Sequence, residues 1–153
     1  MPGVEPRGRC GQTVGVTGEA ILIRPIGRVE SRLVDKDTAP KQGDEGAPAA
    51  HLVFEPDMAE GISDLYPGEE VIVLTWLDRA SRDVLRVHPR GDDRNPTRGV
   101  FSTRSPDRPN PVGLHRVEIV SIDGLRIQVR PLEALDGTPV IDIKPILGPI
   151  TER

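Results

Sequence analysis

The sequence predicts an all-β fold, a small single-domain antiparallel β-barrel with long loops and at most short helical turns. Short runs rich in β-branched residues recur along the chain between turn residues, which is typical of a barrel or a sandwich. An Asp-Gly dipeptide between two alternating runs is the strongest hairpin signal. A doubly wound α/β fold is excluded, because it needs amphipathic helical segments of roughly 10–15 residues and none is visible.

The predicted elements begin after a lead-in. Residues 1–18 are rich in Gly, Pro and Thr and lack apolar periodicity, so we expect a mobile lead-in before a barrel domain over residues 19–153. Residues 21–30 are predicted to form a strand bent at Pro25, because proline favours a strand edge or a bulge. Residues 35–50 follow as a charged loop punctuated by glycine and proline.

The middle of the chain holds the most apolar strand. Residues 51–55 form a short apolar run, and residues 56–65 are expected to make one or two helical turns. The run EVIVLTWL, residues 70–77, is the most apolar in the chain and is rich in β-branched residues. We therefore expect it to be a central strand.

The second half of the chain contains the predicted hairpin. Another strand is expected over residues 99–103. Residues 114–121 and 125–132 then flank the turn at Asp123-Gly124, and residues 140–143 complete the set of strands.

Composition limits the classes of function. The chain has four aromatic residues and one cysteine, Cys10. Few aromatics argue against an RNA module that stacks several bases, and a lone cysteine excludes an internal disulfide or a cysteine-built zinc site. The three histidines, His51, His88 and His115, lack the spacing of metal ligands, so no metal is expected. Without a membrane-length apolar run or a signal-peptide core, a cytoplasmic protein with no membrane contact is expected.

The formal net charge of −4 hides a basic segment. Residues 79–116 contain nine arginines and four aspartates, a local charge of +5, so the rest of the chain carries −9. Arginine presents a planar fork that suits carboxylates and phosphates, which indicates a face for an anion. A GC-rich genome would also raise the arginine count.

The first motif is RGVFSTRSPDRPNPVG, residues 98–113. Its three prolines each fix φ near about −65°, which makes the loop stiff without regular secondary structure. Such a loop presents Arg104 and Arg108 at a low entropic cost of binding. The alternative is a proline-rich surface turn with solvated arginines.

The second motif is LEALDGTPVIDIKP, residues 132–145. It places the carboxylates of Glu133, Asp136 and Asp142 around a tight Asp-Gly turn, where they can accept ribose hydroxyls or hold an ammonium group. The alternative is a β-turn with solvated acids, in which Lys144 pairs with Asp142.

Together the two motifs resemble a known family. GVFSTRSPDRPNPVGL followed by LDGTPVIDIKP is similar to the RSP-x-RPNP-x-G and DGTP-x-x-DIKP motifs of the YaeB/TrmO (TsaA-like) family of S-adenosylmethionine-dependent tRNA methyltransferases. The resemblance runs from about Ile23 to Leu147, and we expect a short form without the C-terminal domain of longer members. It implies a small β-barrel, usually dimeric, and hence a homodimer.

The resemblance also implies an activity. Known members use S-adenosylmethionine to methylate the exocyclic nitrogen of threonylcarbamoyl-adenosine beside the tRNA anticodon, which makes tRNA the expected partner. Two alternatives stay open: a methyltransferase with a small-molecule acceptor, and a non-catalytic module that binds the cofactor or RNA. No side chain stands out as the general base.

By position, the resemblance assigns a set of contacts. The expected cofactor contacts are Lys41, Gln42, Asp78, Arg79, Arg104, Leu114, Leu132, Glu133, Leu135 and Asp136. The expected substrate contacts are Arg108 and Asn110. Within this set, Arg104 is suited to fork the methionine carboxylate, and Glu133 or Asp136 to hold the ribose or the α-ammonium group.

Overall fold

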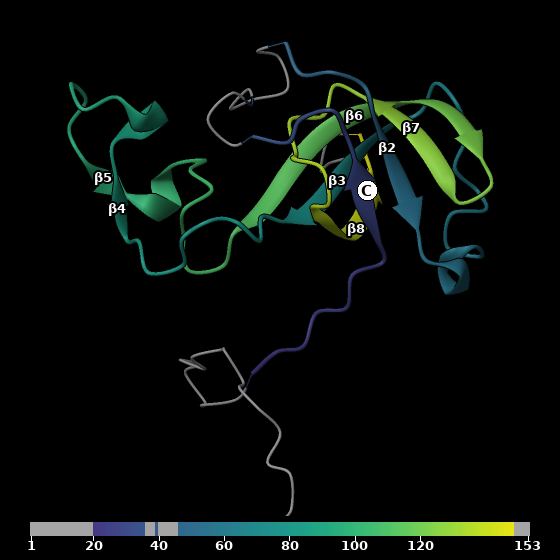
Figure 1. Ribbon diagram of the computed structural model, residues 1–153, viewed down its shortest axis with the longest axis horizontal. Coiled ribbons are helices and arrows are strands. Elements are labelled where there is room, and N and C mark those ends of the chain that lie inside the picture. Colours follow the sequence, from purple (N-terminus) through teal and green to yellow (C-terminus); the bar gives the residue numbers. More distant parts are fainter. Residues whose placement is uncertain (1–19, 36–38, 40–45, 149–153) are drawn as a thin grey trace, which may run out of the picture.

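Six antiparallel strands pair side by side until the sheet closes into a ring (Figure 1). The computed structural model describes residues 20–35, 39 and 46–148. The strands follow one another around the ring in the order β1, β2, β7, β6, β3, β8, and β8 returns to β1. Their bounds are β1 Gly27–Glu30, β2 Ala50–Phe54, β3 Glu70–Trp76, β6 Val112–Asp123, β7 Arg126–Arg130 and β8 Pro139–Pro145.

The all-β prediction is confirmed. The described residues contain no α-helix, and their helical turns are the 3₁₀ helices η2 Pro56–Met58, η3 Pro89–Gly91 and η4 Val100–Ser102. None of these helical elements is long and apolar enough to cross a membrane. The predicted lead-in, together with Lys41 and Gln42, lies outside the described residues.

The core fills the inside of the ring because alternate residues of each strand face inward. In β3 the inward positions are Val71, Val73 and Thr75, all fully buried. Phe54 is the largest core side chain, and the largest of the almost completely buried ones are Leu52, Ile119, Ile127 and Leu132. Closure pairs most of the backbone groups that an open sheet would leave at its two edges.

Two strand predictions are confirmed by the pairing. β3 lies between β6 and β8, so the apolar run is a central strand. β6 and β7 form the predicted hairpin, and Gly124 adopts a φ of 57° in its turn. Positive φ is easily reached by glycine, which explains why the Asp-Gly signal located this turn correctly.

Two other strand predictions are wrong in extent. The ladder of β1 begins at Gly27, and residues 21–25 are extended but unpaired. The strand expected over residues 99–103 is reduced to β5 Arg98–Gly99 and is followed at once by η4. There the backbone N–H of Thr103 donates to Val100 O (3.0 Å) and the Ser102 hydroxyl donates to Gly99 O (2.8 Å). Such local bonds compete with a sheet ladder.

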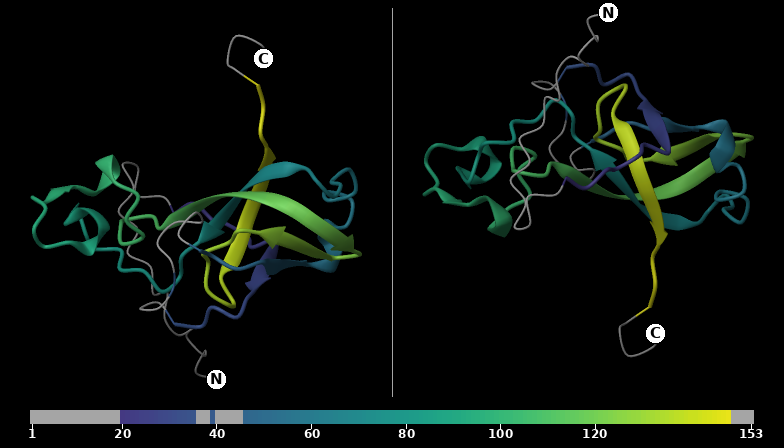
Figure 2. Two further views of the ribbon diagram at one scale, coloured as in Figure 1. Left: turned by 90° about the horizontal axis from the view of Figure 1, so that it is seen from above. Right: turned by 90° about the horizontal axis from the view of Figure 1, so that it is seen from below.

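Residues 79–111, which we call the arginine lobe, project from the ring between β3 and β6. The three views of Figures 1 and 2 agree on this placement. Inside the lobe, β4 Arg86–Val87 pairs with β5. The lobe contains eight arginines and four aspartates, so most of the basic segment lies outside the ring.

Candidate functional site

One end of the ring, the lobe end, gathers the segments singled out in the sequence. Antiparallel pairing sets Thr75 near the end of β3 opposite Gly113 near the start of β6. It likewise sets Ala50 at the start of β2 opposite Val129 near the end of β7. The segments after β3, before β6 and after β7 therefore all leave the ring at the same end, next to the arginine lobe (Figure 1).

A buried chain of polar side chains joins these segments. The His115 ring places Nε2 2.7 Å from Thr75 Oγ1 and Nδ1 2.5 Å from Glu133 Oε1. Thr75 is fully buried, and the side chains of His115 and Glu133 are 4% and 15% exposed. Both imidazole nitrogens thus have partners, and the imidazole of His115 connects β3, β6 and the segment after β7. Buried polar networks of this kind rigidify a structure when every member is satisfied.

Only glycine fits at position 113, next to this pair. A Cβ atom at Gly113 would lie 2.3 Å from Thr75 Oγ1 and 2.7 Å from His115 Nε2. The hydrogen bond between Thr75 and His115 therefore passes directly over the Gly113 Cα atom, where no side chain fits.

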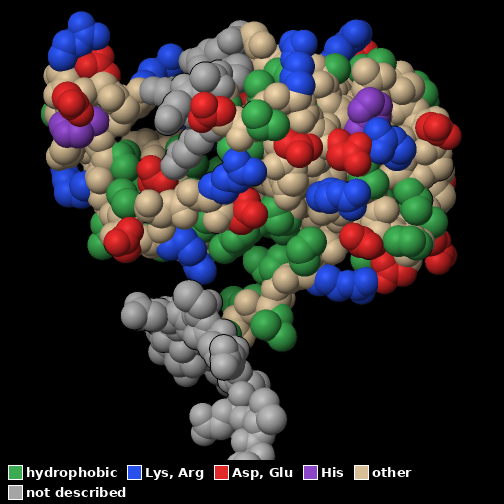
Figure 3. Space-filling view, in the orientation of Figure 1, with side chains coloured by type: hydrophobic (Ala, Val, Ile, Leu, Met, Phe, Trp, Pro, Cys, Tyr) green, Lys and Arg blue, Asp and Glu red, His purple; other side chains and the backbone are tan. Residues whose placement is uncertain are grey.

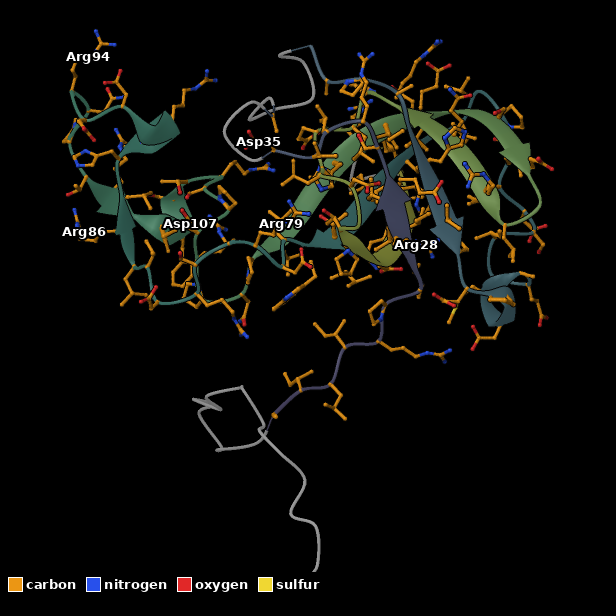
Figure 4. The ribbon with its side chains drawn as sticks, viewed as in Figure 1. Arg28, Asp35, Arg79, Arg86, Arg94 and Asp107 are labelled. Carbon is orange, nitrogen blue, oxygen red and sulfur yellow. The ribbon has the colours of Figure 1, made fainter. Side chains whose placement is uncertain are left out.

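Asp136 and Arg79 are also brought together at the lobe end. The Asp136 N–H donates to Leu33 O (2.7 Å), and its Oδ1 accepts from the Ser31 N–H (3.0 Å). Arg79 donates from Nη1 to Val34 O (3.1 Å) and from Nη2 to Asp136 O (3.5 Å). Figure 4 shows Arg79 between the ring and the lobe. These bonds fix the Asp-Gly turn against the segment after β1.

The remaining predicted positions near this end differ in access. Leu132 is fully buried in the core and its N–H donates to Pro48 O (3.0 Å), so its side chain is out of reach of a ligand. Leu114 points outward and is 49% exposed, while Leu135 is half-buried. Asp78 is exposed.

The first motif forms a loop that closes around Arg108. The guanidinium donates to the carbonyl oxygens of Ser105 (2.8 Å), Val100 (2.8 Å) and Thr103 (2.5 Å). The Nε and Nη2 groups of Arg108 thus hold the backbone of its own loop, and its contact with substrate stays a prediction.

Arg82 anchors the motif to the ring. Its guanidinium lies 5.1 Å from the centre of the Trp76 ring, a cation–π contact with the last residue of β3. It also donates to Pro109 O (2.7 Å) and to Asn110 Oδ1 (3.0 Å). Asn110, the other expected substrate contact, therefore has a structural partner.

Arg104 is the exception in this loop. It is exposed, and within the described part of the chain it has no hydrogen bond or ion pair. The structure does not bring it into contact with Glu133 or Asp136. Its guanidinium is free to receive an anion, which a stiff proline-rich loop presents to solvent.

Other arginines of the lobe are already engaged. Arg86 donates to Thr97 O (2.9 Å), and Arg94 forms an exposed ion pair with Asp92 at 2.8 Å. The hydrogen bond that the Arg94 guanidinium donates to Asp92 raises the pKa of Arg94. Figure 4 places Arg86 and Arg94 at the side of the lobe away from the ring.

An open pocket of about 520 Å³ lies beside β1 and the start of β2. Its lining includes Arg28, Arg32, His51 and Asp136. Asp136 is the single predicted site residue in its lining, so this pocket only adjoins the predicted site. No group of three or more potential ligand side chains in the described ranges is placed to hold a metal ion.

Sequence reasoning missed His115, Thr75 and Arg82. His115 is separated from Glu133 by 18 residues and from Thr75 by 40, so no spacing rule connects them. The available signal was its place in β6, where it alternates with outward residues and occupies an inward position.

Comparison with known proteins shows the family of the chain. Residues 28–150 match the model of the tRNA-methyltransferase O N-terminal domain. The chain is 45% identical over 124 residues to an S-adenosyl-L-methionine-binding protein of Archaeoglobus fulgidus, covering 81% of this chain and 88% of the relative. It is 46% identical over 125 residues to a probable S-adenosyl-L-methionine-binding protein of Methanothermobacter thermautotrophicus, covering 82% and 89%.

A solved structure has the same fold. The crystal structure of TrmO from Pseudomonas aeruginosa superposes with a TM-score of 0.66 at 26% identity. The match covers 84% of this chain and 57% of that chain, so this chain spans little more than half of the TrmO structure. With most of its length matched by one family model, the chain belongs to the tRNA-methyltransferase O N-terminal domain family.

Proposed function

We propose that this protein binds S-adenosylmethionine and transfers its methyl group to the exocyclic nitrogen of threonylcarbamoyl-adenosine in tRNA. One observation carries the proposal. In a chain of the tRNA-methyltransferase O N-terminal domain family, the segments after β3, before β6 and after β7 meet at the lobe end and are tied together through His115. Relatives that align over most of the chain are named S-adenosyl-L-methionine-binding proteins, which supports the cofactor.

The side chains at the lobe end fit this cofactor chemically. The Glu133 and Asp136 carboxylates are suited to the ribose hydroxyls or the α-ammonium group, and both are fixed by hydrogen bonds. The outward side chain of Leu114 and the half-buried Leu135 offer apolar contacts for the adenine ring. Arg104 has a guanidinium free for the methionine carboxylate. Lys41 and Gln42 remain predicted contacts, as do Asp78, Arg79 and the backbone of Leu132.

Bound S-adenosylmethionine would supply the methyl group. The residues of the chain would hold the methyl donor and the acceptor in line. Methyl transfer is an in-line displacement, and this alignment accounts for much of its acceleration. The buried hydrogen bonds that join Thr75, His115 and Glu133 keep the segment after β7, which carries the proposed cofactor contacts, fixed relative to β3 and β6.

We propose the arginine lobe as the docking element for tRNA. Its net charge is +4, while the chain as a whole carries −4, so phosphates would be drawn to this part of the surface. Arg98 is exposed and has no described partner, which leaves its guanidinium group available to phosphate oxygens. We propose that Arg108 and Asn110 shape this surface and contact the substrate there, and we propose a homodimer as the assembly.

Isothermal titration with S-adenosylmethionine tests the cofactor site. Arg104→Ala is expected to weaken binding by about tenfold or more, because a charge-assisted pair with a carboxylate is lost. The matched control is Arg94→Ala, an exposed arginine at the far side of the same lobe. Equal affinity in the two variants would remove Arg104 from the site, and no binding by the wild-type protein would overturn the cofactor.

A methylation assay tests the acceptor. The substrates are tRNA that carries the threonylcarbamoyl group and the same tRNA without it. Product on the first alone is expected. Bound cofactor with no product on either tRNA would overturn the acceptor and leave cofactor binding standing.

A further inference from the structure

The chain enters the ring through an extended, apolar and unpaired segment, which we call the arm, residues 21–25. Ile21 and Leu22 are the two most exposed large apolar side chains in the described ranges, at 89% and 96%, and Ile23 is 51% exposed. No backbone group of the arm bonds to another described residue. Figure 3 shows apolar side chains along the stretch of chain that leaves the body below the ring. An apolar extended segment with free backbone groups is ready to join a sheet.

Two described stretches of the ring lack a strand on one side: residues 112–117 of β6 on the side of β7, and residues 141–145 of β8 on the side of β1. Along residues 140–145, β8 pairs with β3. On its other side β8 pairs with β1 at Pro139 and Val140 alone, so residues 141–145 form an open edge next to an existing ladder. On this edge the Ile143 N–H donates to the Asp142 side chain (2.9 Å), which an incoming strand would have to displace. The apolar side chains of Ile141 and Ile143 lie along this edge and are half-buried.

The arm and the open edge are complementary in direction and length. Continuing the antiparallel β1–β8 ladder beyond Gly27 places residues 22–26 of an incoming strand opposite residues 145–141 of β8. Within one chain residues 21–25 do not follow this path, and Pro25, which has no N–H, contributes no donor to the ladder in either chain. Arg24 in addition forms an ion pair with Asp57 of η2, on the opposite side of β1 from β8.

We propose that two copies of the chain exchange their arms, the arm of each copy adding as an antiparallel strand to the open edge of β8 in the other. The second copy is the partner because it offers both required parts, an apolar strand and the edge that receives it. A reciprocal exchange forms two equivalent ladders and closes the assembly at a dimer. The proposal names the surface of the homodimer proposed above and rests on it, but it is independent of methyl transfer.

Sedimentation velocity over a concentration series tests the exchange in the full chain. The wild-type protein is expected to be a dimer, and Leu22→Asp is expected to raise the dimer dissociation constant by about tenfold or more, since it puts a charge into a buried apolar contact. The control is Leu85→Asp in the arginine lobe, where the leucine is 63% exposed. A monomeric wild type, or an unchanged dimer in Leu22→Asp, would overturn the proposal.

Cysteine cross-linking locates the contact. In a Cys10→Ser background, Ile23→Cys is combined with Lys144→Cys or with Ile143→Cys, because the bulge of β8 opposite Leu74 and Thr75 allows two registers. Oxidation is expected to give a disulfide between chains in one of the two pairs. A disulfide within one chain, or none in either pair, contradicts the exchange. Titration with S-adenosylmethionine on the same proteins reports on the proposed function separately.

Discussion

Gly113 lies beneath the hydrogen bond between Thr75 and His115, and its missing side chain can be tested directly. Gly113→Ala places a Cβ atom 2.3 Å from Thr75 Oγ1 and forces the buried pair apart. Overpacking of this kind typically costs about 1–3 kcal/mol of the free energy of unfolding, measurable by urea denaturation. In the control Gly99→Ala the new Cβ meets nothing within 4 Å and the backbone φ is −56°, so stability should change little. Equal stabilities of the two variants would contradict the packing described at Gly113.

The contribution of the Thr75 hydroxyl to the free energy of unfolding can be measured separately. Thr75→Val keeps the shape of the side chain but leaves His115 Nε2 without its partner in the core. We expect a loss of about 1–3 kcal/mol in the free energy of unfolding, the usual cost of an unsatisfied buried polar group. Thr97→Val, at an exposed threonine that accepts a bond from Arg86, serves as the control and should stay within about 0.5 kcal/mol of wild type. A Thr75→Val protein as stable as wild type would show that another group satisfies the imidazole.

At the scale of elements, the proline-rich loop contains two arginines with different roles: Arg108 holds the loop backbone, and Arg104 has no described partner. Arg108→Lys removes the fork that donates to three carbonyl oxygens, and an ammonium group cannot reproduce that planar geometry. Hydrogen exchange of residues 100–108 is expected to rise by about tenfold or more in this variant. Arg104→Lys, in the same loop but without a described partner, should leave the exchange unchanged. Similar exchange in both variants would mean that the prolines alone hold the loop.

The elements also mark what the sequence could predict. The central strand and the hairpin followed from local signals: a β-branched run in β3 and the φ of 57° that Gly124 accepts. The start of the first strand was misplaced because residues 21–25 have no neighbouring strand in the structure, and strand pairing is a tertiary property. The contact of His115 with Glu133 and the inward role of Arg108 depend on distances in space, which residue types cannot encode. The two motifs identified where the site lies, but not which side chains are free.

Across the whole molecule, the ring and the arginine lobe should differ in stability. The ring buries a continuous core under long ladders, whereas the sheet in the lobe pairs two residues from each of β4 and β5. Two-stranded ribbons are marginal in water, so the lobe should open locally at a lower free energy than the ring. Native-state hydrogen exchange is expected to protect Val73 and Val117 far more than Val87 and Arg98, by roughly a hundredfold or more. Arg82→Ala, which removes the contact with Trp76 and the bond to Pro109, should lower protection in the lobe and leave the ring unchanged. If the lobe exchanged as slowly as the ring, the two would unfold as one cooperative unit, which contradicts this prediction. The lobe would then present a preordered surface to phosphate groups.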